Sequence, residues 1–228
     1  MKLNRKALYV ILTVLLCTIV MSYVDGIIQP QYAVKSLIKL VLFLIVPLGY
    51  FISNRNEISQ FKSLFILNRR DLLIALLLGS GVFAVIIGAY FLLRSFIDFS
   101  GIAQQLTSGA GVNADNFVFV ALYISFANSL LEEFFFRGFA FITLKKMTSR
   151  RFAYVYSSVL FAAYHVGMMV GWFNIGIWIL AIIGLFAGGC IFNYLNEKRG
   201  NIYTSWLVHM FANFAINTVG FIMFGIMK

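Results

Sequence analysis

The sequence predicts an all-α protein, a polytopic transmembrane helical bundle of about seven to eight spans with a cytosolic N-terminus. Three observations lead to this fold class. Of the 228 residues, 61% are hydrophobic and only 11% are charged, whereas about a quarter of the residues in a soluble domain are charged. The apolar residues form runs that can cross a bilayer as helices of about 20 residues. The Lys and Arg residues lie mainly between these runs, where basic side chains set the orientation.

Seven apolar runs are candidates for spans. The first follows a basic N-terminus but no small-residue cleavage site follows it, so we expect a retained helix rather than a signal peptide. The second is short, and Pro47 is expected to kink it. The fourth is expected to continue as a helix to about Leu144. The predicted runs cover residues 7–24, 37–52, 72–93, 117 onward, 152–170, 175–195 and 202–226.

The chain length suits one membrane domain over residues 1–228. Residues 1–116 carry no motif, and residues 117–226 carry the polar residues described below. Two polar connections interrupt the spans, at residues 53–71 and 94–116. The middle of the first, residues 58–67, is partly amphipathic and is expected to lie along the membrane interface.

The distribution of basic residues predicts the orientation. With seven spans and the N-terminus in the cytosol, fourteen of the eighteen Lys and Arg residues lie in cytosolic segments. The exceptions, placed outside or near the outer face, are Lys35, Lys39, Arg94 and Lys228. This asymmetry favours a cytosolic N-terminus. The net charge of +10 belongs to these loops, so no nucleic-acid partner is expected.

Two adjacent carboxylates, Glu132 and Glu133, lie inside the fourth apolar run. A carboxylate at membrane depth is costly unless it is protonated, paired or facing water, so it is a candidate for function. Arg137 follows Glu133 by four residues, in the favourable order for an ion pair on a helix. We therefore expect Glu133 to be neutralised and Glu132 to be the working carboxylate. The non-functional alternative is a helix-end pair that reaches the headgroups.

The two histidines of the chain, His165 and His209, lie in the fifth and seventh runs. Counted from the nearest cytosolic basic residue at 1.5 Å per residue, Glu132, His165 and His209 lie about 20, 21 and 15 Å deep. We therefore expect three spans to bring these side chains to one point. Phe161, one turn before His165, is expected to pack against the imidazole ring.

A polar stripe runs along the seventh span. Its members recur every four residues and are Ser205, His209, Asn213 and Asn217. Hydrogen bonds between helices are a common reason for such residues in membranes. For Ser205 and Asn217, hydrogen bonding between helices and a functional role are equally supported. For His209 and Asn213 a functional role is favoured.

A carboxylate, two imidazoles and an amide suit acyl hydrolysis by activated water. A partly dehydrated glutamate can act as general base on water, and an imidazole and an amide can donate to an oxyanion. Glu132, His165 and His209 could equally ligate a divalent metal such as zinc, because two histidines and a carboxylate form a common hydrolytic zinc site. No HExxH spacing occurs, so metal ligands would come from three helices. The isolated Cys17 and Cys190 do not support nucleophilic or metal chemistry.

These residues resemble the motifs of the CAAX prenyl endopeptidase and bacteriocin-processing family of intramembrane proteases, also called the CPBP or Abi family. The motifs Glu-Glu-x-x-x-Arg, Phe-x-x-x-His and His-x-x-x-Asn match, in order, Glu132, Glu133 and Arg137, then Phe161 and His165, then His209 and Asn213. The resemblance covers residues 128–213, and it makes residues 117–226 the predicted catalytic core. Glu133, Arg137 and Phe161 occupy supporting positions.

The resemblance implies an intramembrane endopeptidase that hydrolyses a peptide bond of a membrane-associated peptide or protein in the lipid bilayer. It implies that Glu132 and His165 activate water. It also implies that His209 and Asn213 form the oxyanion hole. Whether a metal assists is open in this family.

The residue usage, rich in Phe, Ile, Lys and Asn, predicts a multi-pass protein of a bacterial cell membrane. A prenylated CAAX tail is therefore not an obvious substrate. The main alternative is a non-catalytic immunity or scaffold protein that keeps the fold, which loss of motif residues would favour. A second alternative is an ion-coupled carrier, which would place polar residues from the cluster to the outer face.

Overall fold

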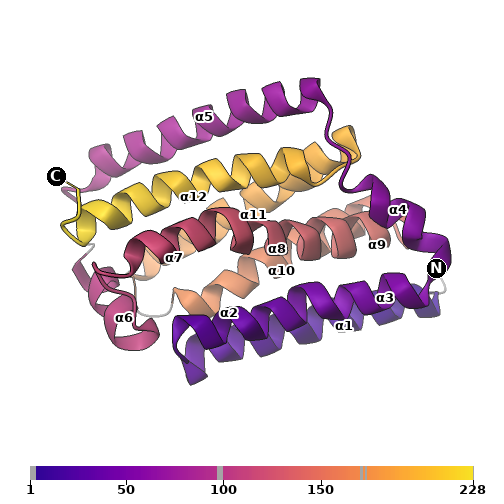
Figure 1. Ribbon diagram of the computed structural model, residues 1–228, viewed down its shortest axis with the longest axis horizontal. Helices are drawn as coiled ribbons and strands as arrows, with labels where there is room; N and C mark the ends of the chain where they lie inside the picture. The colour runs from indigo at the N-terminus through magenta and orange to yellow at the C-terminus, as the bar shows by residue number, and fades with distance from the viewer. Residues whose placement is uncertain (1–3, 97–99, 170–171, 173, 228) are drawn as a thin grey trace.

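The computed structural model describes residues 4–96, 100–169, 172 and 174–227 of the chain. These residues contain helices and no strand, which confirms the predicted all-α class. Figure 1 shows the long helices packed side by side in an elongated bundle, with the two chain termini near opposite ends.

An N-terminal hairpin of two long helices forms one side of the bundle (Figure 1). The outgoing helix is α1 (Arg5–Tyr23), extended by a π-helical turn, η1 (Val24–Ile28). The returning helix consists of α2 (Tyr32–Leu40), the π-helical turn η2 (Val41–Ile45) and α3 (Val46–Ser53). Pro47 stands in the first turn of α3. The π turn η2 ends two residues before this proline, and the kink expected at Pro47 stays a prediction.

The next segment contains the short η3 (Arg55–Glu57) and α4 (Ile58–Ser63), followed by the long α5 (Arg69–Leu93). The side chain of Asn68 begins α5 by accepting a hydrogen bond from the backbone N–H of Asp71, as is usual for a helix cap. The polar connection predicted at 94–116 contains a further helix, α6 (Ser100–Ala110). Its Ser and Gly content gave no indication of that helix.

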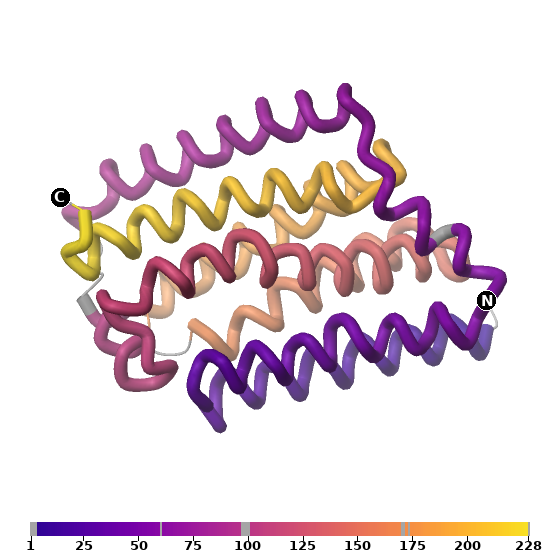
Figure 2. The backbone as a smooth tube through the Cα atoms, viewed as in Figure 1, coloured from indigo at the N-terminus to yellow at the C-terminus, as the bar shows by residue number. Residues whose placement is uncertain are grey.

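One uninterrupted helical run crosses the middle of the bundle, as the tube in Figure 2 shows. It consists of α7 (Phe117–Tyr123), η4 (Ile124–Asn128), α8 (Ser129–Glu132), η5 (Glu133–Ile142) and α9 (Thr143–Met147). The predicted continuation of the fourth span through Leu144 is confirmed. Two of these pieces, η4 and η5, are π-helical, and π-helical segments occur frequently at functional sites.

Three further helices complete the fold: α10 (Arg150–Met168), α11 (Ile175–Arg199) and α12 (Tyr203–Met223). Side chains of Ser149 and Asn174 cap the first two. Gly200 ends α11 with a φ of 72°, a left-handed conformation that glycine adopts without strain. The end predicted for the fifth span at Val170 lies outside the described residues.

The long helices pack in pairs, some of them between helices distant in sequence. α5 packs along α12, α10 along α11, and α1 along α10. The core between them is rich in phenylalanine, and its fully buried rings include those of Phe43, Phe135, Phe136, Phe139 and Phe141. Four of these rings belong to η5 of the central run. They pack outward against both sides of the bundle: Phe135 stacks on Phe43 of the N-terminal hairpin, and Phe136 packs against Phe161 of α10.

Six helical segments of the described chain are long and apolar enough to cross a membrane. They are Arg5–Ile28, Tyr32–Ser53, Arg69–Leu93, Phe117–Met147, Ile175–Arg199 and Tyr203–Met223. α10 is the remaining predicted span; it runs beside α11 but is not among the six. A membrane bundle is therefore confirmed. The count of seven spans and the cytosolic N-terminus stay predictions.

Candidate active site

The two adjacent glutamates stand where α8 meets η5, in the middle of the central run. Glu132 is 1% exposed and Glu133 is 0% exposed. Asn128 lies one turn before Glu132 on the same helix, and its Nδ2 donates to Oε1 of Glu132 over 2.9 Å. Both carboxylates therefore point into the protein, and the alternative in which they reach the headgroups does not apply.

His165 lies in the last turn of α10. Its Nδ1 is 2.7 Å from the carbonyl oxygen of Phe161. Because a carbonyl oxygen only accepts, Nδ1 carries the proton and Nε2 is the acceptor of the neutral ring. That Nε2 lies 3.9 Å from Oε2 of Glu132. The Phe161 ring packs edge-on against the imidazole, with centroids 4.7 Å apart, so Phe161 has the packing contact expected of it.

His209, on α12, contacts both glutamates. Its Nδ1 donates to Oε1 of Glu133 over 3.0 Å, and its Nε2 lies 3.7 Å from Oε2 of Glu132. Oε1 of Glu133 is also 3.4 Å from a guanidinium nitrogen of Arg137. The expected ion pair between Glu133 and Arg137 is therefore present. The same oxygen of Glu133 also accepts the hydrogen bond from His209.

The guanidinium of Arg137 is fully buried and lies among aromatic rings. Its central carbon is 4.0 Å from the centroid of Phe161 and 5.0 Å from that of Phe192. A buried guanidinium over aromatic faces gains cation–π attraction, which offsets part of its desolvation. The Phe192 ring also stacks on His209, with centroids 5.2 Å apart. Arg137 thus links the glutamate pair to the rings that pack against both histidines.

The three side chains expected to converge do so at Oε2 of Glu132. This oxygen is buried and accepts no hydrogen bond within the described part of the chain. Separations of 3.7 and 3.9 Å from the two Nε2 atoms exceed a direct hydrogen bond but suit sharing of one water molecule. The three helices thus bring Glu132, His165 and His209 together, as the similar depths predicted for these residues indicated.

The asparagines of the α12 stripe bind the central run. Asn213 donates from Nδ2 to the carbonyl oxygen of Ile124 over 3.2 Å. Asn217 donates to the carbonyl of Ala121 and to the Ser125 hydroxyl. The hydroxyl of Ser205 accepts from Asn196 on α11 over 2.8 Å. Ser205 and Asn217 therefore have the interhelical role, and the Asn213 amide keeps one further N–H, which no contact between described residues uses.

Lys39 is a member of the site that the sequence analysis placed near the outer face. Its burial within the site was not predicted. Lys39 is 2% exposed, and its ammonium lies 2.5 Å from Oε1 of Glu132. It also donates to Oδ1 of Asn128 and, over 2.6 Å, to the hydroxyl of Tyr164. One sequence signal could have indicated it: two glutamates and one arginine leave an unbalanced negative charge inside the membrane, and Lys39 lies in the second apolar run.

The donor set of Glu132, His165 and His209 has the chemistry of a zinc site, but its arrangement does not fit one. Among the described residues, no group of three His, Cys, Asp or Glu side chains is placed to hold a metal ion. Oε1 of Glu132 is in contact with a lysine ammonium, which would repel a divalent cation at the same carboxylate. The reaction proposed below therefore uses no metal.

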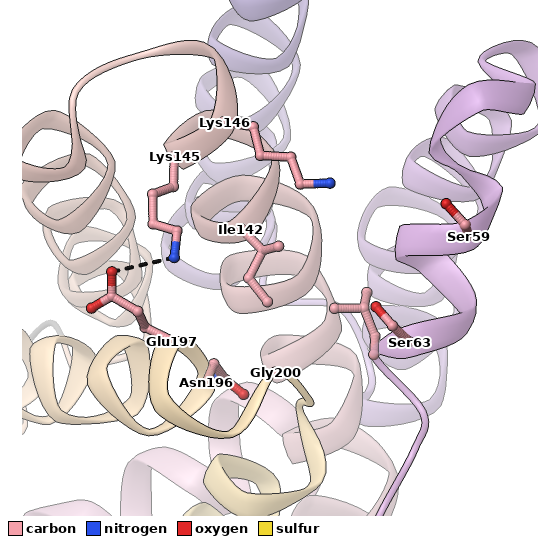
Figure 3. Close-up of a pocket in the computed structure, with 9 residues that line it drawn as sticks. Ser59, Ser63, Ile142, Lys145, Lys146, Asn196, Glu197 and Gly200 are labelled. Atoms are coloured by element: carbon pink, nitrogen blue, oxygen red, sulfur yellow. Dashed lines mark hydrogen bonds and ion pairs between the residues drawn. The ribbon is translucent and has the colours of Figure 1, made fainter.

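A pocket lies apart from this cluster, at the end of the bundle where α4, α9 and α11 meet. Its lining residues are Ser59, Ser63, Leu64, Ile142, Lys145, Lys146, Asn196, Glu197 and Gly200, most of them labelled in Figure 3. Lys145 lies 3.2 Å from the Glu197 carboxylate across it. None of the motif residues lines this pocket, so it is not the candidate active site.

Comparison with known proteins agrees with the geometry. Residues 114–215 match the family model described as type II CAAX prenyl endopeptidase Rce1-like. The match spans the seven motif residues from Glu132 to Asn213. Comparisons with curated proteins and with solved structures found no match. Residues 114–215, which carry the candidate active site, are therefore similar to the Rce1-like CAAX prenyl endopeptidases, a family of proteases.

Proposed function

We propose that this protein is an intramembrane endopeptidase that hydrolyses a peptide bond of a membrane-associated peptide or protein. The observation that carries the proposal is the approach of His165 and His209, from two other helices, to within 3.9 and 3.7 Å of Oε2 of Glu132. The similarity of residues 114–215 to a family of proteases supports the same class of reaction.

In the proposed reaction Glu132 is the general base. A water molecule held between its Oε2 and Nε2 of His165 attacks the carbonyl carbon of the scissile bond, and the carboxylate takes the water's proton. The carbon–nitrogen bond then breaks, and that proton passes to the leaving nitrogen. Burial of the carboxylate in a region of low dielectric strengthens these interactions.

The developing oxyanion is stabilised from α12. In the proposed reaction His209 donates from Nε2 as an imidazolium, and Glu133, which accepts from its Nδ1, balances that charge. The unused N–H of Asn213 supplies a second donor. Two such donors are the usual composition of an oxyanion hole.

The test compares peptides from membranes of cells that carry the wild type, Glu132→Gln or His165→Ala. We expect membrane-associated peptides to accumulate in both variants and their new chain ends to occur only with the wild type. Glu197→Gln is the matched control, because Glu197 is a carboxylate bound by Arg150 outside the cluster. Wild-type processing in Glu132→Gln would refute hydrolysis and favour the non-catalytic immunity or scaffold alternative.

An ion-coupled carrier is a second candidate, because one observation favours it. Asp25 is buried and pairs with Lys35 at 2.7 Å, and Lys35 lies one turn before Lys39 on α2. Polar groups therefore extend from the cluster toward the end of the bundle opposite the N-terminus. Detergent-solubilised protein distinguishes the two candidates, since a peptidase keeps its activity in solution and a carrier needs a sealed membrane.

A further inference from the structure

The ammonium of Lys39 has a complete set of hydrogen-bond partners. A lysine ammonium carries three donor hydrogens and no acceptor. Three oxygens receive them: Oδ1 of Asn128, Oε1 of Glu132 at 2.5 Å and the hydroxyl of Tyr164 at 2.6 Å. The ammonium also lies 4.6 Å from the centroid of the Tyr164 ring. The ammonium group is therefore held in one position.

This arrangement makes the two oxygens of Glu132 different. Oε1 accepts from Lys39 and, over 2.9 Å, from Nδ2 of Asn128. Oε2 accepts from no described residue and is the oxygen nearest the two imidazoles. The lysine and the asparagine thus fix the carboxylate by one oxygen and present the other to the site.

Charge balance gives the lysine a second effect. Glu133 has its own cation in Arg137, four residues away on the same helix. Glu132 has Lys39, which is 93 residues away in sequence and on a different helix. A buried carboxylate without a positive partner favours its protonated form, and a protonated carboxyl cannot act as a base.

We infer that Lys39 is a positioning residue of the proposed peptidase: its ammonium keeps Glu132 ionised and determines which carboxylate oxygen faces the imidazoles. Only the effect of Lys39 on catalysis rests on the proposed function; its effects on the ionisation and orientation of Glu132 do not. Lys39 lies outside the residues that match the family model. The N-terminal hairpin therefore contributes a side chain to the site, in addition to its packing.

The ionisation of Glu132 is measured without any substrate. Infrared spectra of the purified full chain in lipid are recorded for the wild type and for Glu132→Gln, and their difference isolates the Glu132 band. The same difference is then taken in the Lys39→Met and Lys39→Arg backgrounds. We expect an ionised carboxylate band in the wild type and in Lys39→Arg. In Lys39→Met we expect its replacement by the carbonyl band of a protonated carboxyl.

Lys35→Met is the matched control. Lys35 is one turn from Lys39 on the same helix, and it pairs with Asp25 instead of Glu132. Its loss should leave the Glu132 band unchanged. A carboxylate band that persists in Lys39→Met would overturn the inference, and so would an equal change in Lys35→Met.

The effect of Lys39 on catalysis is measured with purified protein. The substrates are the peptides that accumulate in cells carrying Glu132→Gln. Their rate of cleavage by purified protein should fall at least a hundredfold in Lys39→Met, mainly through kcat, and should be partly restored in Lys39→Arg. Cleavage at the wild-type rate by Lys39→Met overturns the inference while the peptidase proposal stands. If the infrared shift occurs but no peptide depends on Glu132, the peptidase proposal fails and the role of Lys39 in holding the carboxylate stands.

Discussion

Nδ1 of His209 donates a hydrogen bond over 3.0 Å to Oε1 of Glu133, while its Nε2 lies 3.7 Å from Oε2 of Glu132, so one imidazole links the two adjacent glutamates. Glu133 also neutralises Arg137, whose side chain is fully buried. Removing the charge of Glu133 would leave an unpaired guanidinium in the core. These contacts make Glu133 a structural residue as well as a support for the proposed oxyanion hole.

Glu133→Gln should therefore destabilise the protein by about 3–5 kcal/mol, the usual cost of removing one partner of a buried ion pair. Thermal unfolding of the purified protein in one fixed lipid mixture measures this. Glu197→Gln removes one partner of a solvent-accessible pair and should cost no more than about 1 kcal/mol. The double variant Glu133→Gln, Arg137→Met should recover much of the loss; a double variant as unstable as the sum of both single variants would contradict the pairing.

Asn213 and Asn217 offer a matched comparison on one helix. Both donate to backbone carbonyls of the central run, so each alanine variant should lose about 0.6–2 kcal/mol of stability. Only Asn213→Ala should also lower kcat, by about a hundred- to a thousandfold, because it removes a proposed oxyanion donor. Thermal unfolding and single-turnover cleavage are measured on the same preparations. An equal effect of both variants on kcat would remove Asn213 from the proposed oxyanion hole.

Gly167 sets the position of the α10 turn that carries His165. A Cβ at this residue would lie 2.6 Å from the backbone carbonyl oxygen of Ser22 in α1, and backbone cannot move aside as a side chain can. Gly167→Ala should cost about 1–3 kcal/mol, as overpacking does, and should lower activity by displacing His165. Gly184→Ala on α11 meets nothing within 4 Å and should keep both stability and activity. Wild-type activity in Gly167→Ala would show that the contact does not position the histidine.

The contact between Lys39 and Glu132 also predicts the response to metal removal. A lysine ammonium at this carboxylate already supplies a positive charge, so a divalent ion would be repelled there. We expect chelator-treated protein to keep its cleavage rate and added zinc not to increase it. Elemental analysis of the active preparation accompanies the assay. Loss of activity on chelation that zinc alone restores would require a different arrangement of Glu132 from the one described.

The sequence predicts the central part of the site well, because helix geometry converts sequence distance into depth. Glu132, His165 and His209 each lie a countable number of residues from a basic helix end, and the rise per residue is constant. Their convergence follows once three helices pack together. The pair of Glu133 and Arg137 is equally accessible to prediction, since both residues lie on one helix four positions apart.

Lys39 could not be placed in the same way. Near the end of an apolar run, a lysine normally extends its chain toward the headgroups, and the sequence alone gives no reason to choose the opposite direction. Its partner Glu132 is 93 residues away, and no spacing rule links two such positions. The helix α6 was not expected either, because its composition resembles that of a loop while its tertiary contacts decide its structure.

The four buried charges of Lys39, Glu132, Glu133 and Arg137 sum to zero when both imidazoles are neutral. A membrane voltage acts on a net charge at a given depth, with about 2.3 kcal/mol per elementary charge for each 100 mV. A cluster without net charge experiences almost no such force. The resting arrangement of these side chains should therefore be the same in an energised membrane and in one whose potential has collapsed.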